Sequence, residues 1–463
     1  MLPSGFVAVL EGIVGPAFVR QDPASVAPYG VDARKIAYPP DIVVIPGSTA
    51  EVAAVASACN GSRVPLVPRG GGTGYTGGAV PVRGGVVVSL ERMNRILEID
   101  EVNLLAVVQP NVVTADLQSA VERRGLFYPP DPASMAESVI GGNVAESAGG
   151  PRAFKYGTTR RYVLALEAVL PTGEVVRTGS KSVKHVVGYD LTQLLVGSEG
   201  TLAIITEIVL RLVPRPQVQE TIRAAFVSVE AAVAAVDAML RGRVMPATLE
   251  LVDRTCLDAV AAYLGEAMAP PGTAAVLLIE VDGFGEAVAE EARRVEASCR
   301  DSGATEVLRA ADEEARRDLW RLRREISPAL GRLAPAKFNH DLVVPRGRVP
   351  QLFHLVERAA EVSGLKVNGF GHAGDGNIHV NIFADPGRPG DLERVKVAER
   401  VLFQGVVALE GSLSGEHGIG FTKAPYLGLQ LSPEVIDLMK RVKRAFDPNG
   451  ILNPGKIFPP DEN

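Results

Sequence analysis

The sequence contains few of the features that mark specialised classes of protein. Its 463 residues include only three cysteines, which lie far apart, so neither a disulfide framework nor a CxxC metal site is predicted. The net charge is -6 and Lys and Arg form no long block, which argues against nucleic acid as a partner. No run of 18 apolar residues occurs, and the apolar start of the chain lacks the basic region of a signal peptide. We therefore expect a cytoplasmic protein without a transmembrane segment, and peripheral membrane attachment stays open.

The remaining composition, with 46% hydrophobic and 22% charged residues, is that of an ordinary globular protein. The length favours two or three domains. Short apolar runs broken by Gly and Pro predict strands up to about residue 215, and strands then alternate with amphipathic helices. The segment 162–179 reads as a hairpin that turns at 171–173, and Thr114 is predicted to cap a helix. We expect an α+β fold with domains at 1–215, 216–410 and 411–463.

A glycine-rich segment, PRGGGTGYTGGAV, spans residues 68–80. It contains a formal GxGxxG at Gly72, Gly74 and Gly77, but Pro81 and another strand follow in place of the helix that a dinucleotide fingerprint must open. No Lys-Ser/Thr pair follows, so a Walker loop is excluded as well. A glycine loop between strands can direct its backbone N–H groups at a diphosphate. The alternative is a loop that needs glycine only for turning.

Histidine is scarce, yet two of the six histidines lie seven positions apart in GFGHAGDGNIHVNIF. The GDGN segment predicts a tight turn, and IHVNIF alternates like a strand, with His379 and Asn381 on one face. A loop histidine, His372, can then converge with the strand histidine. Glu416 in SGEHGIG supplies a candidate third ligand, and two histidines with a carboxylate are typical of a catalytic Zn²⁺ or Mn²⁺ site. The alternative for each histidine is a hydrogen-bonded core residue.

Several long segments support a family resemblance. The glycine loop is followed by PPDPASMAESVIGGNVAESAGG, YDLTQLLVGSEGTLAIITEIVLRL, SGEHGIG and FDPNGILNPGKIF. In this order the chain resembles the FAD-linked oxidases of the vanillyl-alcohol oxidase/p-cresol methylhydroxylase superfamily. It is similar to their branch of D-lactate dehydrogenase, D-2-hydroxyglutarate dehydrogenase and the glycolate oxidase catalytic subunit. The resemblance implies a PCMH-type FAD-binding domain with two subdomains, and a substrate domain with a largely antiparallel sheet. It also implies a C-terminal segment that returns to the FAD domain.

The resemblance also implies where FAD binds. No histidine precedes His185 and Cys59 lies outside the glycine loop, so we expect a non-covalent flavin. Its diphosphate is expected on the glycine loop, at Pro68, Arg69, Gly70, Gly71, Gly72, Thr73, Gly74, Tyr75 and Gly78. The adenine side and the flavin ring are expected at Pro132, Ser134, Ser138, Gly141, Gly142, Asn143, Ala145, Gly149, Gly150, Tyr156, Gly157, Ile204, Ile205 and Asn453.

The catalytic residues are implied in the same way. His372, His379 and Glu416 match the metal ligands of that branch, and His417 matches its catalytic base. Arg323 matches the arginine that binds the substrate carboxylate, and Asn381 and Lys337 are further candidates. Lys337 stands four residues before Asp341, whereas the comparable lysine of the glutarate enzymes stands two before. This departure favours a monocarboxylate.

Together, these expected residues and cofactors predict the reaction. We expect oxidation of a D-2-hydroxy acid, D-lactate-like, to the 2-keto acid, with hydride transfer to FAD and a divalent metal polarising the hydroxyl. The alternatives are a glycolate oxidase catalytic subunit, which would need partner chains, and a D-2-hydroxyglutarate dehydrogenase. An accessory flavoprotein should lack the metal set, and a structural zinc module wants four ligands. The electron acceptor is not identified, and homodimerisation stays open.

Overall fold

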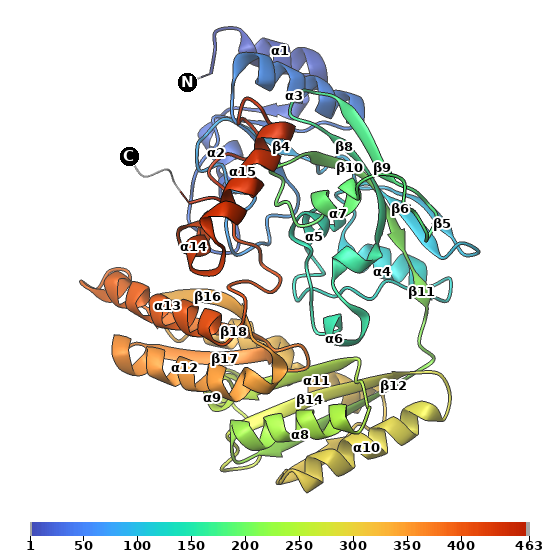
Figure 1. Cartoon of the computed structure of the whole chain (residues 1–463), viewed down its shortest axis with the longest axis vertical. Coiled ribbons are helices and arrows are strands. Elements are labelled where there is room, and N and C mark those ends of the chain that lie inside the picture. Colours follow the sequence, from blue (N-terminus) through green and yellow to red (C-terminus); the bar gives the residue numbers. More distant parts are fainter. Residues whose placement is uncertain (1, 460–463) are drawn as a thin grey trace. The chain divides into compact units, whose positions relative to one another are not determined.

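The computed structural model describes residues 2–459, which form an α+β fold of two compact units (Figure 1). The first unit contains residues 2–149, 157–215 and 416–459, and the second contains residues 150–156 and 216–415. The α+β class and the largely antiparallel sheet of the second unit were predicted and are confirmed. Within the described part of the chain, no helix combines the length and the apolar character needed to span a bilayer.

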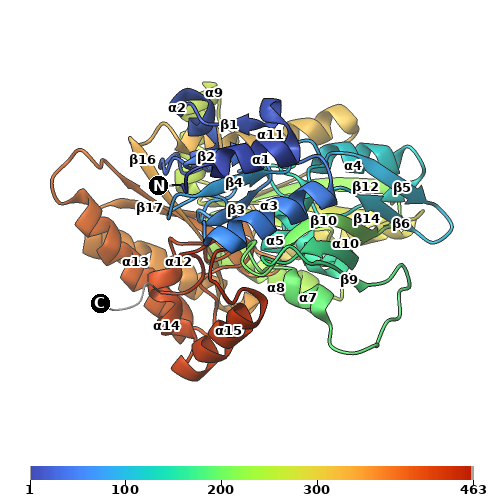
Figure 2. The ribbon, with the colours of Figure 1, turned by 90° about the horizontal axis from the view of Figure 1, so that it is seen from above.

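The first unit begins with a four-stranded sheet in the order β1-β2-β4-β3, in which the last three strands are parallel. Their side chains are buried on both faces, as in parallel sheets covered by other elements. Helices α1 and α3 pack on each other beside this sheet (Figure 2). The elements are α1 (Phe6–Val14), β1 (Val19–Arg20), β2 (Ile42–Val44), α3 (Thr49–Ser62), β3 (Leu66–Arg69) and β4 (Val86–Ser89).

A second sheet of the first unit has five antiparallel strands in the order β5-β6-β10-β8-β9. The predicted hairpin is its β8–β9 pair, and Gly173 at the turn has a φ of 93°, which favours glycine. The strands are β5 (Ile96–Asp100), β6 (Leu105–Val108), β8 (Val163–Val169), β9 (Val175–Gly179) and β10 (Ile204–Arg211). A ribbon pairs β7 (Leu126–Phe127) with β11 (Val213–Pro214).

The predicted cap at Thr114 is wrong. Val113 is the N-cap of α4 (Thr114–Glu122), and the Thr114 hydroxyl instead contacts that of Ser138 at 2.9 Å. Burial explains the difference, because Thr114 is fully enclosed and satisfies its hydroxyl in the core. Other helices of this unit are α2 (Pro23–Val26), α5 (Ile140–Glu146), α7 (Leu191–Leu195), α14 (Leu427–Gln430), α15 (Pro433–Phe446), η1 (Pro16–Phe18), η2 (Ala27–Gly30), η3 (Thr159–Tyr162) and η5 (Ala424–Tyr426).

The second unit is built on a seven-stranded antiparallel sheet in the order β15-β12-β14-β13-β17-β18-β16. Helices pack in pairs, α8 with α10, α9 with α11, and α12 with α13 (Figure 1). The strands are β12 (Val218–Phe226), β13 (Thr248–Asp253), β14 (Ala275–Gly283), β15 (Glu306–Arg309), β16 (Ala336–Val343), β17 (Lys366–His372) and β18 (Asn377–Ala384). The helices are α6 (Ala153–Tyr156), α8 (Val229–Arg241), α9 (Arg254–Leu264), α10 (Ala287–Asp301), α11 (Glu313–Leu330), η4 (Arg346–Arg348), α12 (Val349–Ser363) and α13 (Asp391–Ala408).

The polar residues of the candidate site lie on one face of this sheet. Residues directly opposite in antiparallel strands share a face, and Glu250 is opposite His372 while His379 is opposite Asp341. Phe370, opposite His379, packs with Leu322 and Ile326 of α11 and with residues of α9. Helices α9 and α11 therefore cover the face on which the two histidines lie.

The C-terminal segment completes the first unit. Ile451 and Asn453 form backbone hydrogen bonds with Leu66 of β3. Asp447, which is fully buried, accepts the N–H groups of Ile451 and Leu452 and pairs with Lys443 Nζ at 2.5 Å. This carboxylate fixes the turn that brings the tail back to β3.

We predict that Asp447→Ala lowers the free energy of unfolding by about 3–5 kcal/mol, because it leaves the largely buried Lys443 ammonium without a carboxylate partner and the N–H groups of Ile451 and Leu452 without their acceptor. Urea denaturation measures the change. The matched control is Asp437→Ala on the same helix, whose exposed pair with Arg441 should contribute less than about 1 kcal/mol. Equal losses from both variants would contradict this account of the tail.

Candidate active site

The β17–β18 hairpin brings His372 and His379 together. Their ring centroids are 5.1 Å apart, and a ring nitrogen of one lies within 4.8 Å of one of the other. The predicted turn is confirmed at 373–376, but His372 is the last residue of β17 and does not lie in a loop. Gly376 has a φ of 79°, and a Cβ there would lie 2.0 Å from the Val344 carbonyl oxygen. Glycine is required for this tight connection.

Glu250 on β13 links His372 to α11. Its side chain is fully buried, its Oε1 contacts His372 Nδ1, and its Oε2 accepts a hydrogen bond from Arg323 Nε at 2.5 Å. Burial raises the pKa of the Glu250 carboxyl, but His372 and Arg323 outweigh this effect and hold it well below its usual range. The sequence prediction missed Glu250. The single acid within the largely apolar run ATLELV, residues 247–252, was the available indication.

Arg323 and the other predicted substrate residues lie on α11 and the neighbouring strands. The Arg323 guanidinium carbon lies 5.0 Å from the centroid of the Phe370 ring. Ser327 follows Arg323 by one helical turn, and its Oγ accepts a hydrogen bond from Lys337 Nζ at 3.2 Å. Burial lowers the pKa of Lys337. Asn381 is fully buried, and its amide bonds to Asn339 and Asn368 on the adjacent strands.

The chain leaves the second unit at a fixed point beside these strands. Asp341, fully buried on β16, accepts the Gly415 N–H at 2.8 Å and the Ser414 hydroxyl at 3.1 Å. Glu416 follows Gly415 directly and is counted with the first unit. Asp341 was another residue that the sequence prediction did not single out as functional.

His417 is held within the first unit. Its ring stacks on Tyr75 with centroids 5.2 Å apart, and its carbonyl accepts the Thr76 hydroxyl at 2.8 Å. The N–H groups of Ile419 and Gly420 both donate to the carboxylate of Glu199, whose pKa is raised by burial. The glycine loop and Glu199 thus fix the segment that carries the predicted base. Thr76 and Glu199 were not among the predicted site residues.

The glycine loop follows β3 and is held by hydrogen bonds of Arg69 and by close backbone packing. Arg69, predicted to bind the diphosphate, donates to the carbonyls of Pro28 at 3.2 Å and Ala79 at 3.5 Å. A Cβ on Gly71 would lie 2.7 Å from the Glu137 carbonyl oxygen, so this loop packs closely against the segment before α5. Gly74 is exposed, and a Cβ there would meet nothing within 4 Å. The open side of the loop at Gly74 fits a bulky ligand such as a diphosphate.

Most of the other predicted flavin residues surround this loop. Ser138 and Asn143 both bond to the Thr114 hydroxyl, and Asn453 Nδ2 donates to the carbonyls of Gly78 and Glu199 at 2.8 Å each. The rest lie on β3, in the glycine loop, in the segment before α5, in α5, in the segments that follow it, and on β10: Pro68, Gly70, Gly72, Thr73, Pro132, Ser134, Gly141, Gly142, Ala145, Gly149, Gly157, Ile204 and Ile205.

Two predicted flavin residues, Gly150 and Tyr156, fall in the second unit. The Tyr156 hydroxyl donates to Asp282 Oδ2 at 2.7 Å, and Lys155 Nζ contacts the same carboxylate at 2.5 Å. The short segment 150–156 therefore packs on the polar face of the seven-stranded sheet.

Comparison with known proteins places the chain in a family. Residues 40–179 match the model of the FAD binding domain, and residues 215–457 match the model of the C-terminal domain of FAD linked oxidases. The chain belongs to the FAD-linked oxidases. It shares its fold with p-cresol methylhydroxylase with substrate bound, at a TM-score of 0.84 and 18% identity over 100% of this chain and 99% of that one.

Curated relatives of this FAD-linked oxidase narrow the reaction class. It is 45% identical to glycolate oxidase subunit GlcD of Bacillus subtilis (strain 168), over 91% of this chain and 90% of the relative. It is 37% identical to D-lactate dehydrogenase of Anaerostipes hadrus, over 90% and 89% of the two chains. It is 35% identical to D-2-hydroxyglutarate dehydrogenase of Stutzerimonas stutzeri (strain A1501), over 99% and 100%. The chain is therefore an FAD-dependent oxidoreductase that acts on 2-hydroxy acids.

We predict that Gly74→Ala weakens FAD binding about 10-fold, or by about 1.4 kcal/mol, because the added methyl group enters the space expected for the diphosphate. Equilibrium dialysis of the apoprotein against FAD measures the affinity. Gly12→Ala is the control, since a Cβ there also meets nothing within 4 Å but lies on α1. Unchanged FAD affinity in Gly74→Ala would place the diphosphate elsewhere.

Proposed function

We propose that this chain is the catalytic, FAD-carrying chain of a glycolate-oxidising enzyme. The observation that carries the proposal is the pairing of His372 with His379 on the sheet face where Glu250 holds Arg323. That arrangement offers imidazole ligands for a metal and a guanidinium for a carboxylate within one unit. The 45% identity to a glycolate oxidase subunit favours glycolate over the D-lactate-like substrate that the sequence first suggested.

In this proposal His372, His379 and Glu416 hold a divalent ion, either Zn²⁺ or Mn²⁺. Two imidazole nitrogens and a carboxylate oxygen suit both ions and leave coordination positions for substrate. The anchoring of Gly415 to Asp341 supports the inclusion of Glu416, because it fixes the chain one residue before it. When bound, the ion acts as a Lewis acid that lowers the pKa of the substrate hydroxyl.

Arg323 binds the substrate carboxylate. Its Nε is engaged by Glu250, so the two terminal nitrogens present the edge of the guanidinium that matches a carboxylate in a two-pronged fork. Lys337 supports the same group from β16, because its contact with Ser327 holds it beside α11. A monocarboxylate such as glycolate uses this single anionic site.

His417 takes the proton of the substrate hydroxyl on a ring nitrogen, the usual task of imidazole as a general base. Tyr75 and Thr76 fix the ring and backbone of this residue. The flavin, held without a covalent bond, supplies the hydride acceptor when bound. Because Tyr75 and Thr76 belong to the glycine loop, the same segment places the base and holds the cofactor.

Partner chains form part of the proposal, because the glycolate oxidase relative of Bacillus subtilis is named as a subunit. The loop between β9 and α7 projects from the first unit (Figure 2) and exposes Val183, Val186, Val187 and Tyr189, each at least 70% accessible. Exposed apolar side chains in one place are common where proteins bind other proteins. Such partners would receive the electrons of the reduced flavin.

Anaerobic mixing of the purified protein with glycolate, D-lactate, L-lactate and D-2-hydroxyglutarate tests the proposal through the flavin absorbance. We expect glycolate to bleach the flavin fastest, chelation to abolish the reaction, and Zn²⁺ or Mn²⁺ to restore it. His379→Ala should slow bleaching by at least about 100-fold, while His354→Ala, an exposed histidine on α12, should have no effect. Bleaching by D-lactate alone would favour a lactate enzyme, and bleaching that survives full metal removal would exclude the metal role.

A further inference from the structure

Glu250 contacts two groups that the proposed function assigns to different ligands. It pairs directly across the strands with His372, and α11 brings Arg323 to its other oxygen. The side chain is fully buried, so its negative charge must be matched by these partners. A single carboxylate thus restrains a metal ligand and a carboxylate-binding residue together.

The contact with Glu250 determines which nitrogen of His372 can bind a metal. A carboxylate accepts hydrogen bonds, so His372 Nδ1 carries the proton and donates it to Glu250 Oε1. Nε2 then carries the lone pair, on the opposite side of the ring. A histidine ligand oriented in this way by a carboxylate binds metal more tightly than one without such support.

The other oxygen of Glu250 determines the orientation of Arg323. The guanidinium is planar, so the bond from Nε to Oε2 fixes one edge of the plane and leaves the edge formed by the two terminal nitrogens for a carboxylate. The Phe370 ring lies against the guanidinium carbon at 5.0 Å and holds the plane from one face. The arginine is therefore held ready before any substrate arrives.

We propose that Glu250 is a positioning residue that sets metal affinity and substrate-carboxylate affinity together. The inference rests on the proposed function and adds a residue that touches neither ligand. Replacing Glu250 by glutamine should weaken both sites at once. The amide turns one acceptor oxygen into an NH2 donor, so only one of His372 and Arg323 can keep its contact, and it removes the buried negative charge that both groups face.

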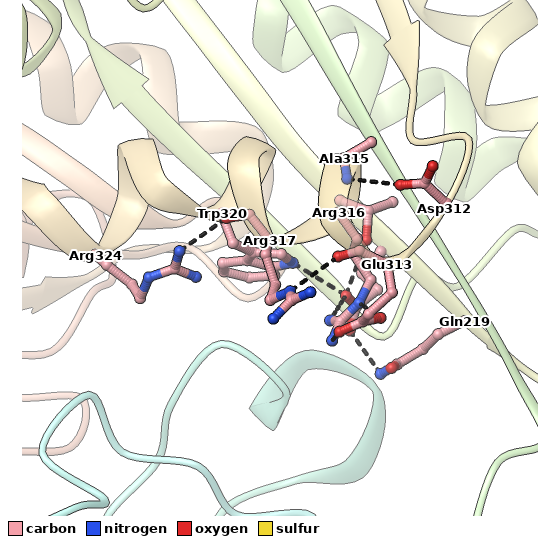
Figure 3. Close-up of polar contacts among 10 residues, drawn as sticks. Gln219, Asp312, Glu313, Ala315, Arg316, Arg317, Trp320 and Arg324 are labelled. Atoms are coloured by element: carbon pink, nitrogen blue, oxygen red, sulfur yellow. Dashed lines mark hydrogen bonds and ion pairs between the residues drawn. The ribbon is translucent and has the colours of Figure 1, made fainter.

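The chain provides a matched control in Glu280 on β14. This carboxylate is also buried on the same sheet face, and it accepts hydrogen bonds from Gln219 at 2.8 Å, Thr221 at 3.0 Å and Trp320 at 3.0 Å. Arg316 of α11 also pairs with it at 3.4 Å, and Figure 3 shows Gln219, Arg316 and Trp320 gathered at this end of α11. Glu280 thus anchors the same helix to the same sheet through groups with no assigned ligand.

The test compares the wild-type chain with E250Q and E280Q after chelator treatment and FAD loading. Zn²⁺ and Mn²⁺ affinities are measured by competition with a chromogenic chelator, and KM and kcat for glycolate are measured with an artificial electron acceptor. We expect E250Q to bind metal about 10–100-fold more weakly and to show a raised KM with metal at saturation. E280Q should keep wild-type values in both measurements, even where its thermal unfolding midpoint falls.

R323K separates the two effects of Glu250. It should raise KM as E250Q does while metal affinity stays at the wild-type value, because His372 keeps its partner. Wild-type metal affinity in E250Q would overturn the inference, and so would an equal loss of metal affinity in E280Q. A wild-type chain that binds metal but does not oxidise glycolate would contradict the proposed function alone, since the metal measurements still test Glu250.

Discussion

Buried carboxylates that must find hydrogen-bond donors organise the second unit. Glu250, Glu280, Asp282 and Asp341 all lie on one face of the seven-stranded sheet, and together they bind three other segments of chain to it. Glu250 and Glu280 accept hydrogen bonds from α11, Asp282 accepts one from the segment 150–156, and Asp341 accepts one from Gly415, directly before Glu416. These donors belong to segments outside the sheet. The hydrogen bonds that they make to the buried carboxylates therefore also hold those segments beside the candidate site.

The first unit holds the proposed general base beside the loop that is predicted to bind the cofactor. Thr76 and Tyr75 belong to the loop predicted to hold the FAD diphosphate, and both contact His417. Glu199 accepts two backbone N–H groups just beyond that histidine. Asn453 of the returning tail bonds to the same region, so the stability of the C-terminal turn also supports the site. The proposed proton-accepting and cofactor-binding functions thus fall on residues that contact each other.

Much of this organisation was predictable from local sequence. The glycine loop between strands, the tight turn before His379 and the hairpin at 171–173 depend on neighbouring residues, and the structure contains all three. Glu250 could not be predicted, because its role depends on the register between β13 and β17, which lie more than 100 residues apart in sequence. Thr114 was misassigned for a related reason: a threonine before a helix resembles a cap until burial directs its hydroxyl to Ser138. The family resemblance identified Tyr156 as a candidate flavin residue. Its contact with Asp282 could not be predicted, because it depends on packing between residues far apart in sequence.

The central claim is that His372 and His379 belong to a catalytic metal site and are not two core histidines. Anomalous X-ray diffraction from crystals of the FAD-loaded protein, recorded on both sides of the Mn and Zn absorption edges, tests it most directly. We expect one strong anomalous peak at about 2.0–2.3 Å from a ring nitrogen of each histidine and from a Glu416 carboxylate oxygen. Density without a metal peak there, after crystals are grown with either ion in excess, would contradict it.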